Sequence, residues 1–202
     1  MATVTSEPPR RRLPRDQRRR IIEEAAETVF AERGYAGARL TDIATAAGVS
    51  RQLMRKHFAT KRDLHLALLT RHRDELLAAL ATATDHAAST DRIAATTDAW
   101  FGYVEQHPYV TRLLFADTTG DAETSAFHER MRDEARGATA AALRADPGLA
   151  LPDDLVEPTA ELIRAATVGL ALWWADHPEH PRERIVASAV GLWRDGLLHP
   201  RR

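Results

Sequence analysis

The sequence predicts an all-α protein of about nine helices, with a three-helix N-terminal domain and a larger C-terminal helical domain. Apolar residues recur three and four positions apart along most of the chain, which is the spacing of helices that bury one face. The alternating pattern of a half-buried strand is missing, and so is an internal repeat. A chain of 202 residues, 44% of them hydrophobic, is long enough for a small domain followed by a larger one.

Nine helices are expected, and local signals mark where several of them begin or end. Gly34 ends the first helix, and Ser50 can cap the third. Thr60 and Asp63 resemble a capping box, with Asp in place of Glu, at the start of the fourth helix. Pro158 is tolerable only in the first turn of the eighth helix. The expected helices span residues 15–33, 40–47, 51–57, 60–83, 91–106, 108–117, 122–145, 154–176 and 182–197.

Three regions follow from these helices and from the composition. Residues 1–14 are rich in proline and arginine and are expected to form a disordered basic arm. Residues 15–62 should form the first domain, and residues 63–202 the second. The arm is expected either to enter a minor groove of DNA or merely to keep the protein in solution.

Charge divides the chain unevenly, although its net charge is only −1. Residues 1–62 hold 14 Lys/Arg and 7 Asp/Glu, whereas the other 140 residues hold 14 Lys/Arg and 22 Asp/Glu. Such asymmetry suggests that the N-terminal part meets a polyanion. A solubilising basic tail is the plain alternative.

Several functional classes find no support in the sequence. The absence of cysteine excludes disulfides, zinc fingers and thiol catalysis, and is compatible with a cytoplasmic location. The apolar stretch 165–175 is shorter than the roughly 20 residues that cross a bilayer, so no membrane partner is expected. Neither a secretory nor a twin-arginine signal follows the N-terminal arginines. No nucleophile elbow, phosphate loop or dinucleotide fingerprint occurs, so we expect no enzyme and no cofactor.

The second and third helices, joined by a turn that contains Gly48, form a helix-turn-helix pattern. Gly48 can take a positive φ without penalty. Val49 and Met54 are expected to face inward, against Ile43 and Phe30. Cationic and amide side chains on the outward face would match the donor and acceptor edges of bases in the major groove. These outward residues are Arg51, Gln52, Arg55 and Lys56.

The stretch from Ile21 to Leu69, about a quarter of the chain, resembles the tetracycline-repressor (TetR) family of regulators. Three pieces carry the resemblance, and together they are highly specific. They read AAETVFAERGYAGARL, DIATAAGVSRQLMRKHF and TKRDLHLALL. The resemblance implies an all-helical homodimer that binds double-stranded DNA at a near-palindromic operator. It also implies a small-molecule effector, of unknown identity, bound in the C-terminal domain.

The resemblance also assigns roles to residues of the first domain. Arg51, Gln52 and Leu53 would contact base edges or sugars, since the family places this helix in the major groove. Lys56 and His57 would lie near the DNA backbone. Lys61 stands at the position of the family's phosphate-contacting lysine, and the free amides and positive end of the helix dipole there also attract an anion.

Two positions depart from the family's usual pattern. Arg55 stands where the family usually has a tyrosine that contacts phosphate, so this arginine could take that contact or reach a guanine. Arg39 stands where a threonine or serine usually opens the second helix, which weakens the cap. Thr41, one turn further on, could still reach a phosphate.

Aromatic and polar residues of the C-terminal domain are candidates for an effector pocket, because ligand pockets are mostly apolar with a few polar groups. For each of them an ordinary core position is the alternative, and for the histidines the alternative is a structural role. The candidates are Trp100, Tyr103, His107, Leu114, Phe127, Met131 and Trp173, with His128 as a further polar group.

The segment 159–176 is apolar nearly all round, so it must be covered on more than one side. The family dimerises through its last two long helices, which implies the same here. The expected interface residues are Ala166, Gly169, Leu170, Ala189 and Trp193. The loop His177–His180 holds two histidines and a glutamate, but it is short and contains proline, so we expect no metal site there.

The sequence therefore predicts a ligand-responsive DNA-binding regulator, in most cases of this kind a repressor released from its operator by ligand. One alternative is a ligand-independent DNA-binding or assembly protein with a filled C-terminal core. A helical enzyme is a second alternative, against which the missing catalytic motifs argue.

Overall fold

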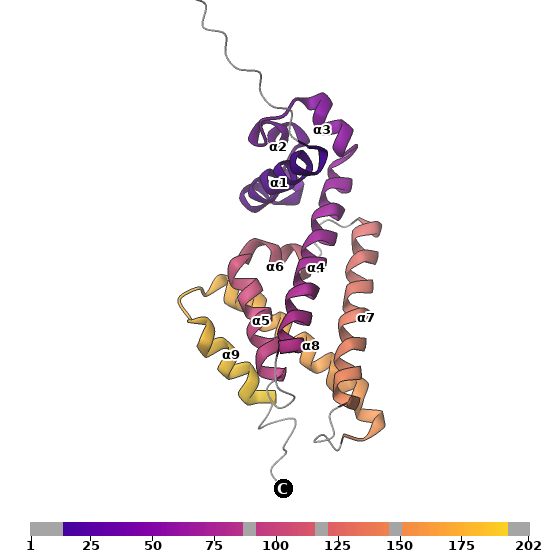
Figure 1. Cartoon of the computed structure of the whole chain (residues 1–202), viewed down its shortest axis with the longest axis vertical. Helices are drawn as coiled ribbons and strands as arrows, with labels where there is room; N and C mark the ends of the chain where they lie inside the picture. The colour runs from indigo at the N-terminus through magenta and orange to yellow at the C-terminus, as the bar shows by residue number, and fades with distance from the viewer. Residues whose placement is uncertain (1–13, 87–91, 116–120, 146–150, 194–202) are drawn as a thin grey trace, which may run out of the picture. The chain divides into compact units, whose positions relative to one another are not determined.

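A computed structural model describes residues 14–86, 92–115, 121–145 and 151–193 of the chain. Within these ranges the protein has nine helices and no strand, so the predicted fold class is confirmed (Figure 1). The chain divides into two compact units between His65 and Leu66. Apart from Pro14, the predicted basic arm lies outside the described residues.

The first unit is built from α1 (Arg15–Gly37), α2 (Leu40–Ala46), α3 (Arg51–His57) and the start of α4 (Lys61–His86). α1 packs against α2, and α2 packs against α3. The largest fully buried side chains of this unit come from all four helices, which explains why such short helices are stable together. They are Ile22, Phe30, Ile43, Met54 and Leu64.

Met54, Ile43 and Phe30 are buried as the sequence predicted, whereas Val49 is only half-buried. Gly34 has a φ of 66° and a ψ of 169°, which are not helical values, and it separates the main part of α1 from one further turn. The helical pattern therefore breaks where it was predicted to end.

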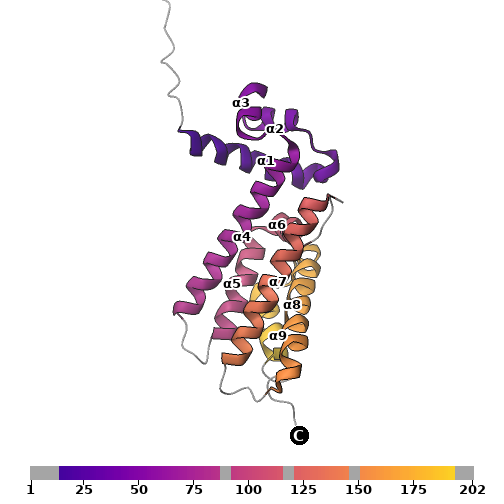
Figure 2. The same ribbon diagram turned by 90° about the vertical axis from the view of Figure 1, so that its right-hand side faces the viewer.

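The second unit consists of the rest of α4 together with α5 (Arg92–Gln106), α6 (Pro108–Phe115), α7 (Ala122–Ala145), α8 (Asp153–Asp176) and α9 (Arg182–Gly191). Figures 1 and 2 show α7 and α8 side by side, and α5 packs in the same way against α9. A smaller apolar cluster joins α7 to α8 through Ala140, Leu143, Val156 and Ala160.

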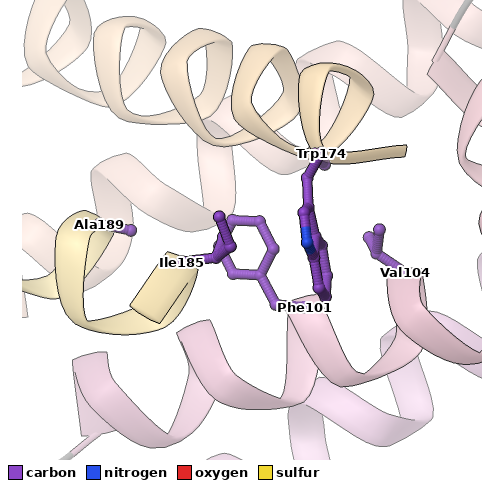
Figure 3. Close-up of a cluster of buried hydrophobic side chains, with 6 residues drawn as sticks. Phe101, Val104, Trp174, Ile185 and Ala189 are labelled. Atoms are coloured by element: carbon purple, nitrogen blue, oxygen red, sulfur yellow. The ribbon is translucent and has the colours of Figure 1, made fainter. Parts of the chain in front are cut away.

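A second apolar cluster joins α5, α8 and α9 (Figure 3). The rings of Phe101 and Trp174 meet edge to face, 5.8 Å apart, and Ile185 and Ala189 of α9 lie beside them. Trp174 donates its indole N–H to the backbone oxygen of His180 at 2.8 Å. This bond satisfies the polar end of a buried ring and fixes the short connection between α8 and α9.

The expectation that Pro158 lies in the first turn of its helix is wrong. α8 begins at Asp153, so the proline is its sixth residue. Proline removes one helical hydrogen bond, to the carbonyl four residues earlier. That carbonyl belongs to Asp154, which is exposed like Pro158 itself, so water can satisfy it.

The turn between α2 and α3 sets how the two helices meet. Gly48 has a φ of 64°, in the left-handed region that favours glycine. Its amide donates to the oxygen of Thr45 at 3.1 Å, and the amide of Val49 donates to the oxygen of Ala44 at 2.9 Å. This pair of bonds is the Schellman motif, which ends a helix sharply and turns the chain away.

We expect Gly48→Ala to lower the free energy of unfolding by about 1 kcal/mol, because a Cβ is strained at this φ. A clash is not the cause, since a Cβ at Gly48 would meet no atom within 4 Å. Gly137, exposed within α7, is the matched control, because Ala there fits the helix and should raise the free energy by roughly 0.5–1 kcal/mol. Urea unfolding followed by circular dichroism measures both; shifts of the same sign would contradict the assigned strain.

Candidate functional site

The recognition surface predicted from the sequence centres on α3, and the first feature of that helix is its cap. Ser50 accepts a hydrogen bond from the amide of Leu53 at 3.1 Å, as predicted. Met54 is buried, which fixes the rotation of the helix about its axis. The side chains on the opposite face are exposed, as expected: Arg51, Gln52, Arg55 and Lys56. Leu53 is half-buried and lies at the edge of that face.

Arg39 and Thr41 lie exposed at the start of α2. Arg39 occupies the N-cap position, and its side chain makes no capping hydrogen bond, in line with the weak cap that the sequence suggested. Thr41 is in the first turn of the helix. Both residues belong to the same unit as α3, but their predicted contacts with DNA remain predictions.

Other cations of the first unit are engaged with carboxylates. Arg19 binds Glu23 at 2.9 Å, and Arg33 binds Asp42 at 2.7 Å. The Arg19 guanidinium also lies 4.9 Å from the centre of the Phe58 ring. These side chains stabilise the unit locally, so the net charge of the N-terminal part overstates the number of cations held out to solvent.

His57, at the end of α3, is half-buried beside four cations. Burial lowers the pKa of its imidazole, and the positive charges of Arg15, Arg18, Arg19 and Lys56 lower it further. The ordinary pKa of histidine is about 6.5, so a lowered value leaves this ring neutral at pH 7.

Lys61 is the predicted site residue whose surroundings differ most from expectation. Its ammonium group donates to the backbone oxygen of Tyr35 at 2.6 Å and to that of Ala38 at 3.0 Å. A third oxygen, of Ala36, lies at 3.4 Å. The ammonium also lies 4.3 Å from the centre of the Tyr35 ring. The group is thus bound within the unit itself.

In the second unit the structure brings Tyr103 and His107 together with His72, a residue that the sequence analysis missed. His72 Nδ1 lies 2.7 Å from the Tyr103 hydroxyl, and the His107 and Tyr103 rings are 4.5 Å apart. Burial is the main cause that raises the pKa of Tyr103 and lowers that of His107. His65 and His72 are seven residues apart, which puts them on one face of a helix, and that spacing was the signal in the sequence. Both are buried in the structure.

Donor and acceptor roles around His72 can be assigned from its neighbours. Arg71 Nη2 lies 3.1 Å from Nε2, and a guanidinium can only donate, so Nε2 accepts and the proton is on Nδ1. Nδ1 then donates to the Tyr103 hydroxyl, which donates to the backbone oxygen of His72 at 3.2 Å. Glu75 lies 3.5 Å from the same nitrogen. This network joins α4 to α5 through polar groups.

The other predicted pocket residues differ in how far they are buried. Leu114 and Phe127 are buried, and Met131 is half-buried. The Trp100 ring packs 5.0 Å from that of Phe115, and its Nε1 is buried with no hydrogen-bond partner among the described residues.

Trp173 lies at the surface of α8. It is 43% exposed and stacks on His177 at 4.2 Å. An apolar run includes surface positions of a helix as well as buried ones, and Trp173 is at a surface position.

An apolar groove of about 500 Å³ lies between α5 and α9. Ala94, Ala95, Val186 and Val190 are among the residues that line it, with the carboxylates of Asp98 and Glu183. None of the predicted pocket residues lines this groove.

One face of α8 is apolar and exposed. Leu162 is 51% exposed, Gly169 and Trp173 are exposed, and Ala166 and Leu170 are half-buried. Residues 162, 166, 169 and 173 follow the spacing of a single helix face. Two other expected interface residues, Ala189 and Trp193, are buried, with exposed fractions of only 4% and 5%.

His177 and His180, the remaining candidates for metal ligation, both lie beside the Trp173 ring. Across the described parts of the chain no three His, Cys, Asp or Glu side chains gather in a way that could hold a metal ion. Within the same residues, none of the helices has the length and apolar character needed to span a membrane.

Two family models match the sequence, one toward each end of the chain. Residues 22–68 match the model described as bacterial regulatory proteins, tetR family. Residues 90–194 match the model of the tetracyclin repressor-like C-terminal domain. The second match alone covers more than half of the chain.

The curated relatives are transcriptional regulators and include an activator and a repressor. The HTH-type transcriptional activator FasR of Mycolicibacterium smegmatis is 42% identical over 108 residues, which are 52% of this chain and 48% of that relative. The chain thus matches about half the length of that relative. An HTH-type transcriptional repressor of Streptomyces coelicolor is 29% identical over 176 residues, which are 87% of this chain and 86% of the relative.

Solved structures share the fold at low identity. A TetR-like transcriptional regulator from Rhodococcus sp. RHA1 is 23% identical with a TM-score of 0.78, over 93% of this chain and 100% of the other. FadR from Bacillus subtilis, in complex with stearoyl-CoA, is 16% identical with a TM-score of 0.76, over 88% and 98%. AibR, in complex with isovaleryl coenzyme A and operator DNA, is 22% identical with a TM-score of 0.70, over 87% and 97%.

Proposed function

The chain belongs to the tetR family of bacterial regulatory proteins, and we propose that it is a homodimeric repressor that leaves its operator when a small molecule binds its C-terminal domain. The observation that carries this proposal is the exposed face of α3. A regulator of bacterial DNA acts in the cytoplasm, where the chromosome lies. We propose no enzymatic activity for the protein.

α3 has the size, charge and setting of a recognition helix. It is short, capped at its start by Ser50, and anchored by the buried Met54. Arg51 and Arg55, one turn apart, share its exposed face with Gln52. A guanidinium can donate two hydrogen bonds to guanine, and a glutamine side chain can pair with adenine, so these side chains suit base reading in the major groove.

The apolar face of α8 supports the dimer. Leu162 and Trp173 expose large apolar side chains, and Gly169 between them allows a partner helix to approach closely. A two-fold axis between two such faces makes the interface self-complementary. Two recognition helices related by this axis would enter successive major grooves, about 34–36 Å apart, which requires a near-palindromic operator.

The region around Trp100 and the network of His72, Tyr103 and His107 is our candidate effector site. The buried Trp100 Nε1 has no acceptor among the described residues, and a buried donor without a partner costs free energy that a ligand acceptor could recover. A carbonyl oxygen is such an acceptor. Acyl-CoA ligands, which two structural neighbours bind, carry a thioester carbonyl and are the class that we propose to test.

Release by ligand requires that the ligand bind more tightly to the conformation with lower operator affinity. His72 of the candidate effector site is on α4, the helix that begins at Lys61 in the first unit. A shift of α4 is therefore the coupling that we propose. If the protein were an activator, like the relative from Mycolicibacterium smegmatis, a transcription assay would show that bound protein raises transcription from the operator where a repressor lowers it.

Gln52→Ala should change which operator is preferred. Loss of the amide removes about 1–3 kcal/mol of discrimination at one base pair in each half-site. The operator is first selected from random duplexes and then varied one base pair at a time in binding assays. Lys56→Met is the control, since loss of a backbone contact should weaken all sequences alike. If Gln52→Ala kept the wild-type preference at every position, Gln52 would not read bases.

Leu162→Glu should convert the dimer to a monomer, because the pairing of two α8 faces would bury two uncompensated carboxylates at the two-fold interface. Leu77→Glu on α4 is the matched control, since Leu77 is 52% exposed against 51% for Leu162. Sedimentation velocity measures the oligomeric state of both. A dimer that survives Leu162→Glu would rule out this face of α8.

Trp100→Phe should raise the ligand concentration that releases DNA by roughly tenfold, which corresponds to one hydrogen bond of about 1.4 kcal/mol. The measurement is operator release by isovaleryl-CoA and stearoyl-CoA. Leu77→Met, at an exposed position of α4, should respond like the wild type. If neither thioester releases wild-type protein, the proposed ligand class is wrong; if the substitution changes nothing, Trp100 is not the donor.

A further inference from the structure

The first two turns of α1 carry arginines in two different settings. Arg19 is paired, since its guanidinium lies 2.9 Å from the Glu23 carboxylate. Arg15, which is exposed, and Arg18, which is half-buried, have no carboxylate partner among the residues that the structure describes. The charges of these two arginines are therefore not neutralised within that part of the chain.

The contact between Arg19 and Phe58 shows which side of α1 faces α3. Phe58 is the C-cap of α3 and is buried, and the Arg19 guanidinium lies 4.9 Å from the centre of its ring. Ile22, three residues after Arg19, is fully buried. Residues 15, 18, 19 and 22 follow the spacing of a single helix side. Arg15 and Arg18 therefore lie on the side of α1 that meets the end of α3.

His57, at the end of α3, lies where the charges of the two helices come together. Burial lowers the pKa of its imidazole, and four positive charges lower it further. They belong to Arg15, Arg18 and Arg19 of α1 and to Lys56 of α3. Because such interactions fall off with distance and are screened by salt, all four cations lie near this one ring. Cations held close together repel each other, and a bound polyanion relieves that repulsion.

We propose that Arg15 and Arg18 bind phosphates of the DNA backbone beside the groove that α3 enters, as one continuous patch of cations with Lys56. This inference rests on the proposed DNA-binding function and adds α1 to the helices that contact DNA. A guanidinium suits this role, because it can donate two parallel hydrogen bonds to the oxygens of one phosphate. Phosphate contacts fix the orientation of a protein on the duplex without reading its sequence. The two arginines therefore strengthen binding to every duplex, whereas Gln52 selects among duplexes.

The salt dependence of binding separates a cation that reaches a phosphate from one that does not. Each lost phosphate contact lowers the slope of log affinity against log salt by about 0.9, and a two-fold dimer loses two contacts per substitution. The experiment therefore compares Arg15→Gln and Arg18→Gln with Arg20→Gln in the full chain, on the selected operator and on a random duplex. Arg20 is the matched control, because it removes the same charge from the same helix. Its guanidinium lies 3.7 Å from the Glu24 carboxylate, away from the side that carries residues 15 and 18.

We expect Arg15→Gln and Arg18→Gln each to weaken binding to both duplexes by a similar factor, roughly tenfold, and to lower the salt slope by about 1.8. Arg20→Gln should keep an affinity and a slope close to those of the wild type. Fluorescence anisotropy at several salt concentrations measures both quantities. If neither arginine changes the slope more than Arg20→Gln does, the proposal is wrong. Wild-type protein that binds neither duplex would instead refute the proposed function.

Two further measurements test the contact itself and the position of the arginines. Operator duplexes with a neutral methylphosphonate linkage at one position at a time should include one that weakens the wild type but not Arg18→Gln, because that variant has already lost the contact. A scan in which every linkage affects both proteins equally would overturn the proposal. Without DNA, an NMR titration of His57 should show its pKa raised in Arg15→Gln and in Arg18→Gln, since each removes a repelling charge. An unchanged pKa in both variants would place the arginines away from α3 and would also overturn the proposal.

Discussion

The left-handed backbone of Gly48 is the constraint on which the presentation of α3 depends. Its φ of 64° allows the amides of Gly48 and Val49 to donate to carbonyl oxygens in the last turn of α2. These bonds end the helix sharply. The chain then enters α3 at Ser50, which bonds the amide of Leu53. With Met54 buried beneath, the helix has one rotation about its axis, and the same rotation exposes its arginines. A local backbone geometry thus determines where the positive charge lies.

Elements bounded by local signals could be predicted from the sequence, and those shaped by distant contacts less well. The helices 51–57 and 122–145 have the predicted bounds, and both follow residues that cap a helix from outside: Ser50 and Asp121 accept bonds from amides three residues on. Pro158 was expected to mark the first turn of its helix, yet α8 begins five residues earlier. The missing bond there faces water, and exposure of a carbonyl is a property of the packed unit, not of the local sequence.

The candidate sites show the same contrast between local sequence signals and contacts from distant residues. The exposed face of α3 follows from helical periodicity alone, once Met54 is taken as buried. The partners of Lys61 are 23 to 26 residues away, and Tyr103 meets His72 across 31 residues, so neither contact has a signal in the local pattern. Trp173 was misplaced for a related reason: an apolar helix gives no indication of which apolar face its own domain covers.

Net charge is a poor measure of what the first unit can offer to DNA, and the contacts explain why. Arg19 and Arg33 are paired with carboxylates, and Lys61 is bound to backbone oxygens. Counterion release counts only cations that reach phosphates, so paired cations add to the charge of the chain without adding to the salt dependence of binding. The cations that are paired within the unit instead help to hold its helices together. Exposed cations on α3, such as Lys56, are among those that remain available to a polyanion.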